Sequence, residues 1–435
     1  MVRAPMTEFA NASETRLLLA QRSYMLFIGA RFLATMGVMV QATTIAWQIY
    51  NLARLQGLGV KQASLQLGLV GLIQFLPVLG LVLISGHAAD HYDRRKIMVL
   101  SLSADLVSTL VLAALGFTHP MIWPIFMIAA AFGCSRAFIG PAGGALAPML
   151  VPRELMPRAL AWNSLSWQTA TIIGPVVGGA VLALAARLGF NDHAAGWAYV
   201  SSAVLYVLSV ASLTLIRGKT RPDRQEGSRW EMMKEGMAYV AGQKIVLGAI
   251  SLDLFAVLLG GATALLPVFA ADVLPLRADE KALAYGLLRA MPGVGAALVA
   301  FYLAGRPVKR RAGRAIFTGV AIFGAATVVF GLSRSLPLSM VALAVLGGAD
   351  MLSVYVRQTL VQIVTPDAMR GRVAAVSSLF IGASNELGEF ESGVAARFLG
   401  PVGAAVFGGV GALIVTGAWA KMFPSLRKAD RLSAD

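Results

Sequence analysis

Apolar segments long enough to cross a membrane recur along the whole 435-residue chain. Hydrophobic residues make up 57% of the sequence and charged residues only 14%, whereas a soluble domain carries about 25% charged residues. A helix of about 20 apolar residues spans the hydrocarbon layer because all its backbone polar groups are bonded internally. The sequence therefore predicts an all-α membrane protein.

Twelve transmembrane helices are predicted, as two pseudo-symmetric six-helix bundles on either side of a charged stretch. The first six lie near 24–49, 65–88, 97–117, 121–147, 159–186 and 195–216, and the last six near 245–272, 284–304, 315–333, 338–364, 373–397 and 402–421. We expect an N-terminal half (1–216), a basic cytoplasmic linker (217–244) and a C-terminal half (245–435). Related halves with a site between them are typical of secondary transporters.

The linker contains a segment with helical periodicity. Trp230, Met233, Met237 and Val240 fall on one helical face. This pattern predicts either a short amphipathic helix at the membrane interface or an N-terminal extension of the next span.

The basic residues orient the chain in the membrane. The formal net charge is +15, and Lys and Arg gather in alternate loops, above all at 94–96, 217–244 and 305–314. The intervening loops hold few of them: Arg54, Lys61, Arg187, Arg277, Lys281 and Arg334. The positive-inside rule then predicts that both termini lie in the cytoplasm. We expect a multi-pass protein of a bacterial-type inner membrane. The charge serves topology, so no nucleic-acid partner is expected.

Two segments, 151–165 and 365–379, repeat each other. They join the fourth predicted helix to the fifth and the tenth to the eleventh. At one constant shift, four positions are identical: Pro152 and Pro366, Arg158 and Arg372, Ser164 and Ser378, and Leu165 and Leu379. The repeat supports two related halves.

The loop after the second span has the sequence GHAADHYDRRK over 86–96. It resembles the G-x-x-x-D-(R/K)-x-G-(R/K)-(R/K) signature of the major facilitator superfamily, although Asp93 replaces the usual Gly and His91 the usual basic residue. The resemblance, which covers essentially the whole chain, implies that four residues form a cytoplasmic gate: Gly86, Asp90, Arg94 and Arg95. The alternative is an ordinary positive loop.

The resemblance also implies transport by alternating access around a central cavity, with the lipid bilayer, a small-molecule substrate and protons as partners, no cofactor and a monomeric chain. The segment 349–373, the loop 90–96 and the turn 152–154 resemble the enterobactin-exporter-like and macrolide-efflux-like branch. That branch implies proton-driven efflux, as siderophore export or multidrug resistance.

Arg136 lies inside the fourth span, where a guanidinium is costly and marks function by default. Its spacing to Gly140 resembles a helix-4 motif whose arginine the family links to proton transfer. The alternative is that Arg136 snorkels to the interface.

The fifth span contains Gly174, Pro175, Gly178 and Gly179. These residues resemble the G-P-x-x-G-G core of the family's antiporter motif, which is found mainly in exporters. Proline bends a helix and glycines admit a close neighbour. Ordinary small-residue packing is the alternative.

Acidic residues inside spans are the candidates for proton coupling. Glu386 and Glu389, three residues apart, share a helical face and are our first choice; Asp253 is second, and Arg136 is a further candidate. Alternatively, these glutamates line a wet outer vestibule and pair with Arg397 or another cation. Four further residues are candidates for contact with substrate in the cavity: Arg31, Asp105, Arg289 and Arg357.

Other functions are weighed against export. An uptake symporter on the same fold and a non-transporting membrane sensor or assembly factor are the alternatives. We expect no enzyme, because the sequence offers no nucleophile–base pair, and no metal site, because the single cysteine (Cys134) and four histidines form no cluster. ATP drive is unsupported, since Leu213 stands where a phosphate-binding loop before Gly218 would require glycine.

Overall fold

The computed structural model describes residues 15–118, 121–218, 220–221, 229–308 and 310–430. Parts of the predicted linker, 219 and 222–228, lie outside these ranges. The described residues form helices joined by short turns, with no strand among them, so the predicted all-α class is confirmed.

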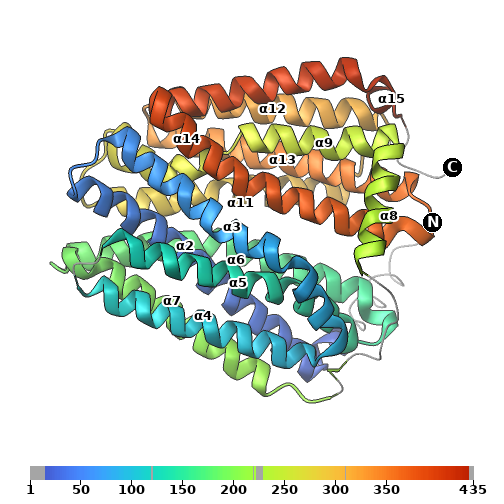
Figure 1. The fold of residues 1–435 in the computed structure, drawn as a ribbon, viewed down its shortest axis with the longest axis horizontal. Coiled ribbons are helices and arrows are strands. Elements are labelled where there is room, and N and C mark those ends of the chain that lie inside the picture. Colours follow the sequence, from blue (N-terminus) through green and yellow to red (C-terminus); the bar gives the residue numbers. More distant parts are fainter. Residues whose placement is uncertain (1–14, 119–120, 219, 222–228, 309, 431–435) are drawn as a thin grey trace, which may run out of the picture.

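The first six long helices come before the linker (Figure 1). They are α2 (Arg22–Leu55), α3 (Val60–His91), α4 (Arg94–Gly116), α5 (Ile122–Leu146), α6 (Met156–Arg187) and α7 (Ala194–Thr214). Three short 3₁₀ turns lie between them: η1 (Ala147–Met149), η2 (Arg153–Leu155) and η3 (Asn191–His193). The predicted spans lie on these helices, whose ends extend a few residues further.

The remaining long helices follow a shorter helix, α8 (Arg229–Gly242). They are α9 (Lys244–Leu259), α11 (Lys281–Gly305), α12 (Ala312–Leu332), α13 (Leu336–Val364) and α14 (Asp367–Met422), and α15 (Pro424–Arg427) ends the described chain. Between α9 and α11 the chain continues through η4 (Ala262–Leu265), α10 (Leu266–Val268) and a π-helical turn, η5 (Phe269–Val273).

Eleven helices in the described ranges are long and apolar enough to cross a membrane. The last of them, α14, has 56 residues, about twice the length that a span needs. Gly400 interrupts it with φ 76° and ψ 167°, a conformation that glycine adopts readily, and Pro401 follows. Two spans therefore meet at Gly400, which is consistent with the twelve predicted helices.

The helices pack in two groups. Helices α2 to α7 pack among themselves, as do α9 and α11 to α14, and the main contacts between the groups are α3 with α14 and α6 with α11. Figure 1 shows the later helices above the earlier ones. The two helix pairs α3–α14 and α6–α11 thus form the seams along which one group meets the other.

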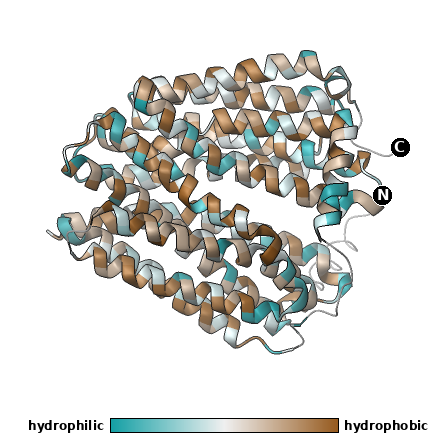
Figure 2. Ribbon diagram, viewed as in Figure 1, coloured by the Kyte–Doolittle hydropathy of each residue, from teal (hydrophilic) through white to brown (hydrophobic). Residues whose placement is uncertain are grey.

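Hydrophobic residues predominate along the helices, and hydrophilic residues gather toward the two ends of the bundle (Figure 2). Large apolar side chains are strongly exposed on the surface: Leu100, Trp123 and Phe301 are 74%, 74% and 85% exposed. We call the end that carries α8, α15 and the loop before α4 the basic end, and the end with the α2–α3 turn and η5 the far end. This distribution fits a protein whose solvent is lipid.

The two repeated segments have the same backbone geometry. Pro152 precedes η2 with φ −55° and ψ 148°, and Pro366 precedes α14 with φ −57° and ψ 148°. The sequence repeat therefore marks a structural repeat at equivalent entries to α6 and α14.

Helix α8 is separate from α9, because Gln243 between them is extended at φ −104° and ψ 99°. Its prediction as an N-terminal extension of the next span is therefore wrong. Gly236 lies against α14, where an added Cβ would be 2.9 Å from the Arg372 carbonyl, and Glu235 forms a 2.6 Å ion pair with Arg372. The predicted apolar face is divided: Val240 is buried, whereas Trp230 is 48% exposed.

Candidate functional site

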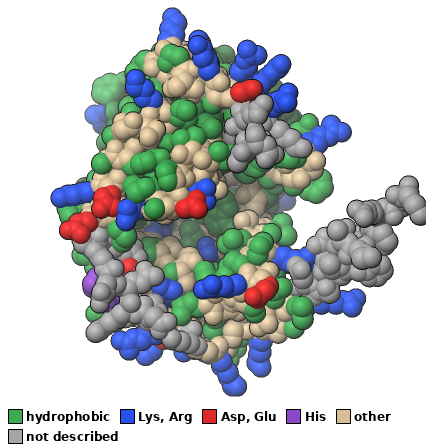
Figure 3. All heavy atoms as spheres, turned by 90° about the vertical axis from the view of Figure 1, so that its right-hand side faces the viewer, with side chains coloured by type: hydrophobic (Ala, Val, Ile, Leu, Met, Phe, Trp, Pro, Cys, Tyr) green, Lys and Arg blue, Asp and Glu red, His purple; other side chains and the backbone are tan. Residues whose placement is uncertain are grey.

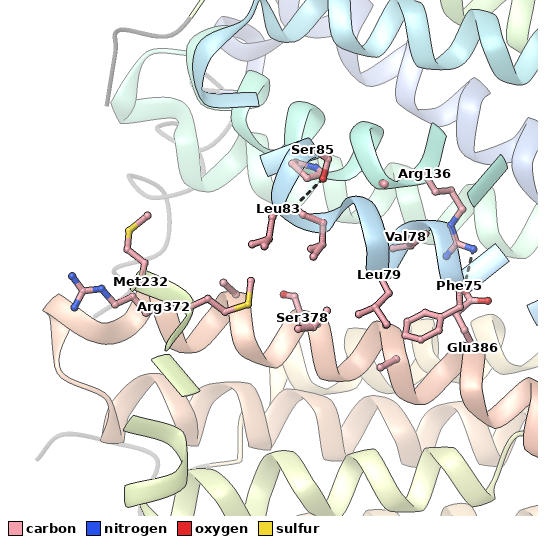
Figure 4. Close-up of a pocket in the computed structure, with 18 of the residues that line it drawn as sticks. Phe75, Val78, Leu79, Leu83, Ser85, Arg136, Met232, Arg372, Ser378 and Glu386 are labelled. Carbon is pink, nitrogen blue, oxygen red and sulfur yellow. Dashed lines mark hydrogen bonds and ion pairs between the residues drawn. The ribbon is translucent and has the colours of Figure 1, made fainter. Parts of the chain in front are cut away.

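A cavity opens at the basic end between the two helix groups. Its volume is about 380 Å³, and it is lined by α3 and α5 on one side, by α14 on the other and by α8 at the mouth. Figure 3 looks onto this end and shows a hollow between two masses of side chains, with Lys and Arg around its rim. The lining is mainly apolar, as the side chains of Phe75, Leu79, Leu83 and Met232 in Figure 4 illustrate.

The deep end of the cavity holds an ion pair between the groups. Arg136 Nη1 on α5 lies 2.9 Å from Glu386 Oε1 on α14, and the two side chains point toward each other in Figure 4. The Arg136 side chain is 47% exposed and that of Glu386 14%. Arg136 also reaches Gln74 Oε1 on α3 at 3.5 Å. It is therefore held by polar partners at the cavity rather than snorkelling, and the cation that pairs with Glu386 is Arg136.

Glu389 and Arg289 extend this charged cluster. Glu389 lies against α3, where a Cβ on Gly71 would be 3.0 Å from its Cβ. Arg289 on α11 donates a hydrogen bond to Tyr285 Oη at 3.0 Å and interacts electrostatically with Glu389 and Glu386. Two acids and two arginines from α5, α11 and α14 thus interact electrostatically near the closed end of the cavity. Sequence reasoning selected all four, but their mutual pairing was not visible in it.

Asp253 is placed away from the cavity lining. It forms an ion pair with Arg357, joining α9 to α13 inside the second group, and the two side chains are only 8% and 3% exposed. Asp350 interacts electrostatically with both. Proton coupling through Asp253 and substrate contact by Arg357 remain predictions.

Asp105 and Arg31 also lie outside the cavity lining. Asp105 on α4 is 2% exposed, and its Oδ1 has no hydrogen-bond partner among the described residues. The Arg31 guanidinium on α2 lies 5.8 Å from the centre of the Phe27 ring. Substrate contact by these two residues remains a prediction.

The predicted gate loop ties together helix ends of the first group. Arg94 donates hydrogen bonds to the carbonyls of Ala89 and Ala145, at 2.9 Å each, and Arg95 donates to the carbonyl of Ile216. Gly86 is buried on α3, and Asp90 lies near the end of that helix. Their role as a gate remains a prediction.

Asp93, noted in the sequence only as a departure from the family pattern, caps α4. Its Oδ1 accepts hydrogen bonds from the backbone N–H groups of Arg95 and Lys96, at 3.0 and 3.2 Å, and from the Thr220 hydroxyl at 2.8 Å. A signal was present, since Asp directly before a helix is a preferred N-cap. Asp93 therefore fixes both the start of α4 and the start of the linker.

The glycines of the α6 motif face two different neighbours. Gly174 and Gly178 pack on α2, where a Cβ on Gly178 would be 3.2 Å from the Val40 carbonyl. Gly179 packs across the seam on α11, where an added Cβ would be 2.9 Å from the Gly286 Cα. Pro175 lies within α6, which remains helical through it. The motif thus sits where α6 contacts both its own group and the other.

The far end is closed by contacts between the groups. A Cβ on Gly68 of α3 would be 2.9 Å from the Gly393 Cα of α14, so these backbones nearly touch. Lys61 Nζ donates to the Phe398 carbonyl at 3.0 Å, and Arg187 lies 3.3 Å from Asp279. The protein is therefore open at its basic end and closed at its far end.

Two groups of apolar helices, with an ion pair between them at the deep end of a mainly apolar cavity that opens on one side, define a membrane transporter. The chain matches the transmembrane secretion effector family over residues 18–435, and it belongs to this family of the major facilitator superfamily. Curated relatives are similar over most of their length. Enterobactin exporter EntS of Shigella boydii serotype 18 is 24% identical over 387 residues, covering 88% of this chain and 84% of the relative. EntS of Citrobacter koseri has the same identity and coverage.

Solved structures share the fold at low identity. A POT family transporter in complex with 5-aminolevulinic acid has a TM-score of 0.71 at 11% identity, covering 93% of this chain and 96% of that one. A D-xylose-proton symporter has a TM-score of 0.70 at 12% identity, covering 94% and 99%. A bacterial homolog of the lysosomal transporter Spinster, inward-facing and unoccupied, has a TM-score of 0.68 at 14% identity, covering 94% and 96%. The predicted major facilitator fold is therefore confirmed.

Proposed function

We propose that this transporter is a proton-coupled antiporter that exports a small amphiphilic molecule, siderophore-like or drug-like, from the cytoplasm. The observation that carries the proposal is the Arg136–Glu386 ion pair at the deep end of an apolar cavity. The pair joins the two helix groups, so any rocking of one group against the other must change it.

The orientation follows from charge. The loops at the basic end carry most of the Lys and Arg residues, which are retained on the cytoplasmic side of membranes. With that orientation the cavity faces the cytoplasm and the far end faces outward. A molecule leaving the cytoplasm would then enter past α8 and bind against the apolar lining.

Glu386 supplies the coupling step. While ionised it is held by Arg136, and this electrostatic attraction stabilises the inward-open arrangement. After the groups rock, Glu386 would face the outer side and accept a proton, which removes its attraction for Arg136 and favours release of the cargo. Return of the protonated carrier and loss of the proton to the cytoplasm would restore the ion pair.

The lining indicates the chemistry of the cargo. Apolar side chains of Phe75, Leu79 and Leu83 offer burial to a hydrophobic body, while the charged groups of the lining lie at the deep end and the mouth. The relatives named enterobactin exporters support a siderophore, and the Gly179–Gly286 contact at the α6 motif supports the antiporter class.

Efflux from cells tests the proposal. A strain without its own exporters would express the wild type, Glu386→Gln or Glu391→Gln, and accumulation of siderophores, macrolides and cationic dyes would be measured. Glu391 is a matched control, because it lies on the same helix and its nearest hydrogen-bond partner is Ser392 rather than a cavity residue. We expect the wild type and Glu391→Gln to lower accumulation of at least one compound, and a protonophore or Glu386→Gln to abolish this effect. Accumulation that rises with the wild type would instead favour uptake.

A further inference from the structure

The far end contains a polar contact that joins the two groups and belongs to none of the motifs above. Tyr50, near the end of α2, donates its hydroxyl hydrogen to Asp272 Oδ2 in the π-helical turn η5. Arg54, one turn further along α2, places its Nε 3.6 Å from the same oxygen. One carboxylate of the second group is therefore held by two side chains of the first.

We infer that Asp272 forms the main polar latch of the closed far end, with Tyr50 and Arg54 as its partners. It acts as a positioning residue for the occluded side of the transporter. The inference goes beyond the proposed export function, because it assigns the latch on the side opposite the cavity and holds for either direction of transport.

Because Tyr50 is buried, its hydrogen bond to Asp272 affects the stability of the closed far end. Tyr50 is 1% exposed, and a buried phenol needs a hydrogen-bond partner. Asp272 is that partner, and its side chain is 30% exposed. A hydrogen bond to an ionised acceptor is about twice as strong as a neutral one. Separation of the groups at this end would remove Asp272 from Tyr50, so the contact favours the closed state.

The turn that carries Asp272 has an irregular backbone that orients this side chain. A π-helical turn of five residues, Phe269–Val273, replaces regular helix just before the chain becomes extended at Leu274. Such turns change the direction in which side chains project and occur often at functional sites. Lys281 at the start of α11 donates a hydrogen bond to the Ala271 carbonyl, which anchors the turn. The turn thus presents Asp272 to α2 from a fixed support.

Other polar contacts at this end are weaker candidates. Arg187 and Asp279 also join the groups, at 3.3 Å, but their side chains are 56% and 48% exposed, so water competes for both. Lys61 reaches only a backbone carbonyl, that of Phe398. The Arg187–Asp279 pair therefore offers a matched control for Asp272.

Distance measurements between spin labels test the latch without substrate or proton gradient. Cys134 would be replaced by Ser, because it is exposed and would be labelled. Labels at Gln56 and Ala278, exposed positions on either side of the far end, would report its opening; labels at His87 and Ala374 would report the basic end. The variants are Asp272→Ala, Tyr50→Phe and the control Asp279→Ala, all in lipid nanodiscs.

We expect Asp272→Ala to raise the ratio of open to closed far ends about tenfold and Tyr50→Phe by a smaller factor, while Asp279→Ala changes it less than about twofold. The basic-end distances should shorten in the same molecules. Far-end distances in both Asp272→Ala and Tyr50→Phe that match those of Asp279→Ala would overturn the inference. If Asp272→Ala does not fold, Tyr50→Phe alone decides: an unchanged distribution overturns it. A negative result would leave the export proposal untouched, because no transport is measured.

Discussion

Arg136 on α5 and Glu386 on α14 form a 2.9 Å ion pair that connects the two helix groups at the deep end of the cavity. The cavity separates α3 from α14 at the basic end, and the two helices pack closely toward the far end. The pair lies between these two regions. Toward the far end, Gly71 lies against Glu389 and Gly68 against Gly393. Rocking of one group against the other must therefore change the distance between the two partners of this pair.

Loss of either partner should impair transport to a similar degree as loss of both. We expect Arg136→Gln and Glu386→Gln each to reduce the initial rate of transport into everted vesicles by about tenfold or more, and the double variant to be little worse than the poorer single variant. The reason is that the first change already leaves the second residue without its charged partner. Losses that multiply in the double variant would show that the two residues act independently.

Asp253 is expected to matter first for stability. Its ion pair with Arg357 is almost fully buried, and removal of one partner of a buried pair costs about 3–5 kcal/mol because the other charge stays uncompensated. Asp253→Asn should therefore lower the free energy of unfolding in mixed micelles by about that amount, and Asp253→Asn with Arg357→Gln should recover part of the loss.

The exposed pair Asp367–Arg370 provides the control for this measurement. Its atoms are 2.8 Å apart, but the Asp367 side chain is 87% exposed. Asp367→Asn should change the unfolding free energy by about 0–1 kcal/mol. Equal effects of Asp253→Asn and Asp367→Asn would contradict the buried character of the Asp253–Arg357 pair.

Two glycines of α3 should respond oppositely to a methyl group. Gly68→Ala places a Cβ 2.9 Å from the Gly393 Cα and 3.0 Å from the Phe390 carbonyl, so α3 and α14 must move apart. We expect it to destabilise the closed far end by about 1–3 kcal/mol, measured from spin-label distances across that end. The added Cβ of Gly80→Ala meets nothing within 4 Å, so this variant should leave the far-end distances unchanged. Since alanine favours helix, its free energy of unfolding should be unchanged or higher by up to about 1 kcal/mol. Equal changes of the far-end distances in Gly68→Ala and Gly80→Ala would argue against the close packing of α3 on α14.

Asp93 should contribute as a helix cap. Asp93→Ala removes the acceptor for two backbone N–H groups at the start of α4 and for the Thr220 hydroxyl. A loss of about 1 kcal/mol in unfolding free energy is expected, and Asp93→Asn should restore most of it because Asn also caps helices. A variant Thr220→Val as damaging as Asp93→Ala would show that the linker contact, and not the cap, carries the effect.

The sequence predicts the spans well because hydropathy alone decides which segments cross lipid. Hydropathy does not predict the irregular parts of a span. The predicted span 245–272 is interrupted at Gly260 and finishes in a π-helical turn, which hydropathy cannot distinguish from regular helix. Gly400, by contrast, lies in the short stretch predicted between the last two spans, where a break was expected.

The site is predictable only as a set of separate residues. Arg136, Glu386 and Glu389 could be selected from the sequence because a charged side chain inside a membrane span is costly and therefore marks a functional residue. Their partners depend on how helices rotate and pack, which a single sequence does not contain. The Asp253–Arg357 pair was missed for this reason. Asp272 was missed because an acid at the end of a predicted span looks like an ordinary loop residue.

Proton movement driven by cargo tests the central claim most directly. The transporter would be reconstituted in liposomes loaded with a compound that it exports from cells, together with a pH-sensitive dye, and diluted into compound-free buffer. Because antiport moves protons against the cargo, the wild type should acidify the lumen as the compound leaves, and Glu386→Gln should abolish this acidification. Alkalinisation of the lumen, or acidification that is unchanged in Glu386→Gln, would contradict proton-coupled export through Glu386.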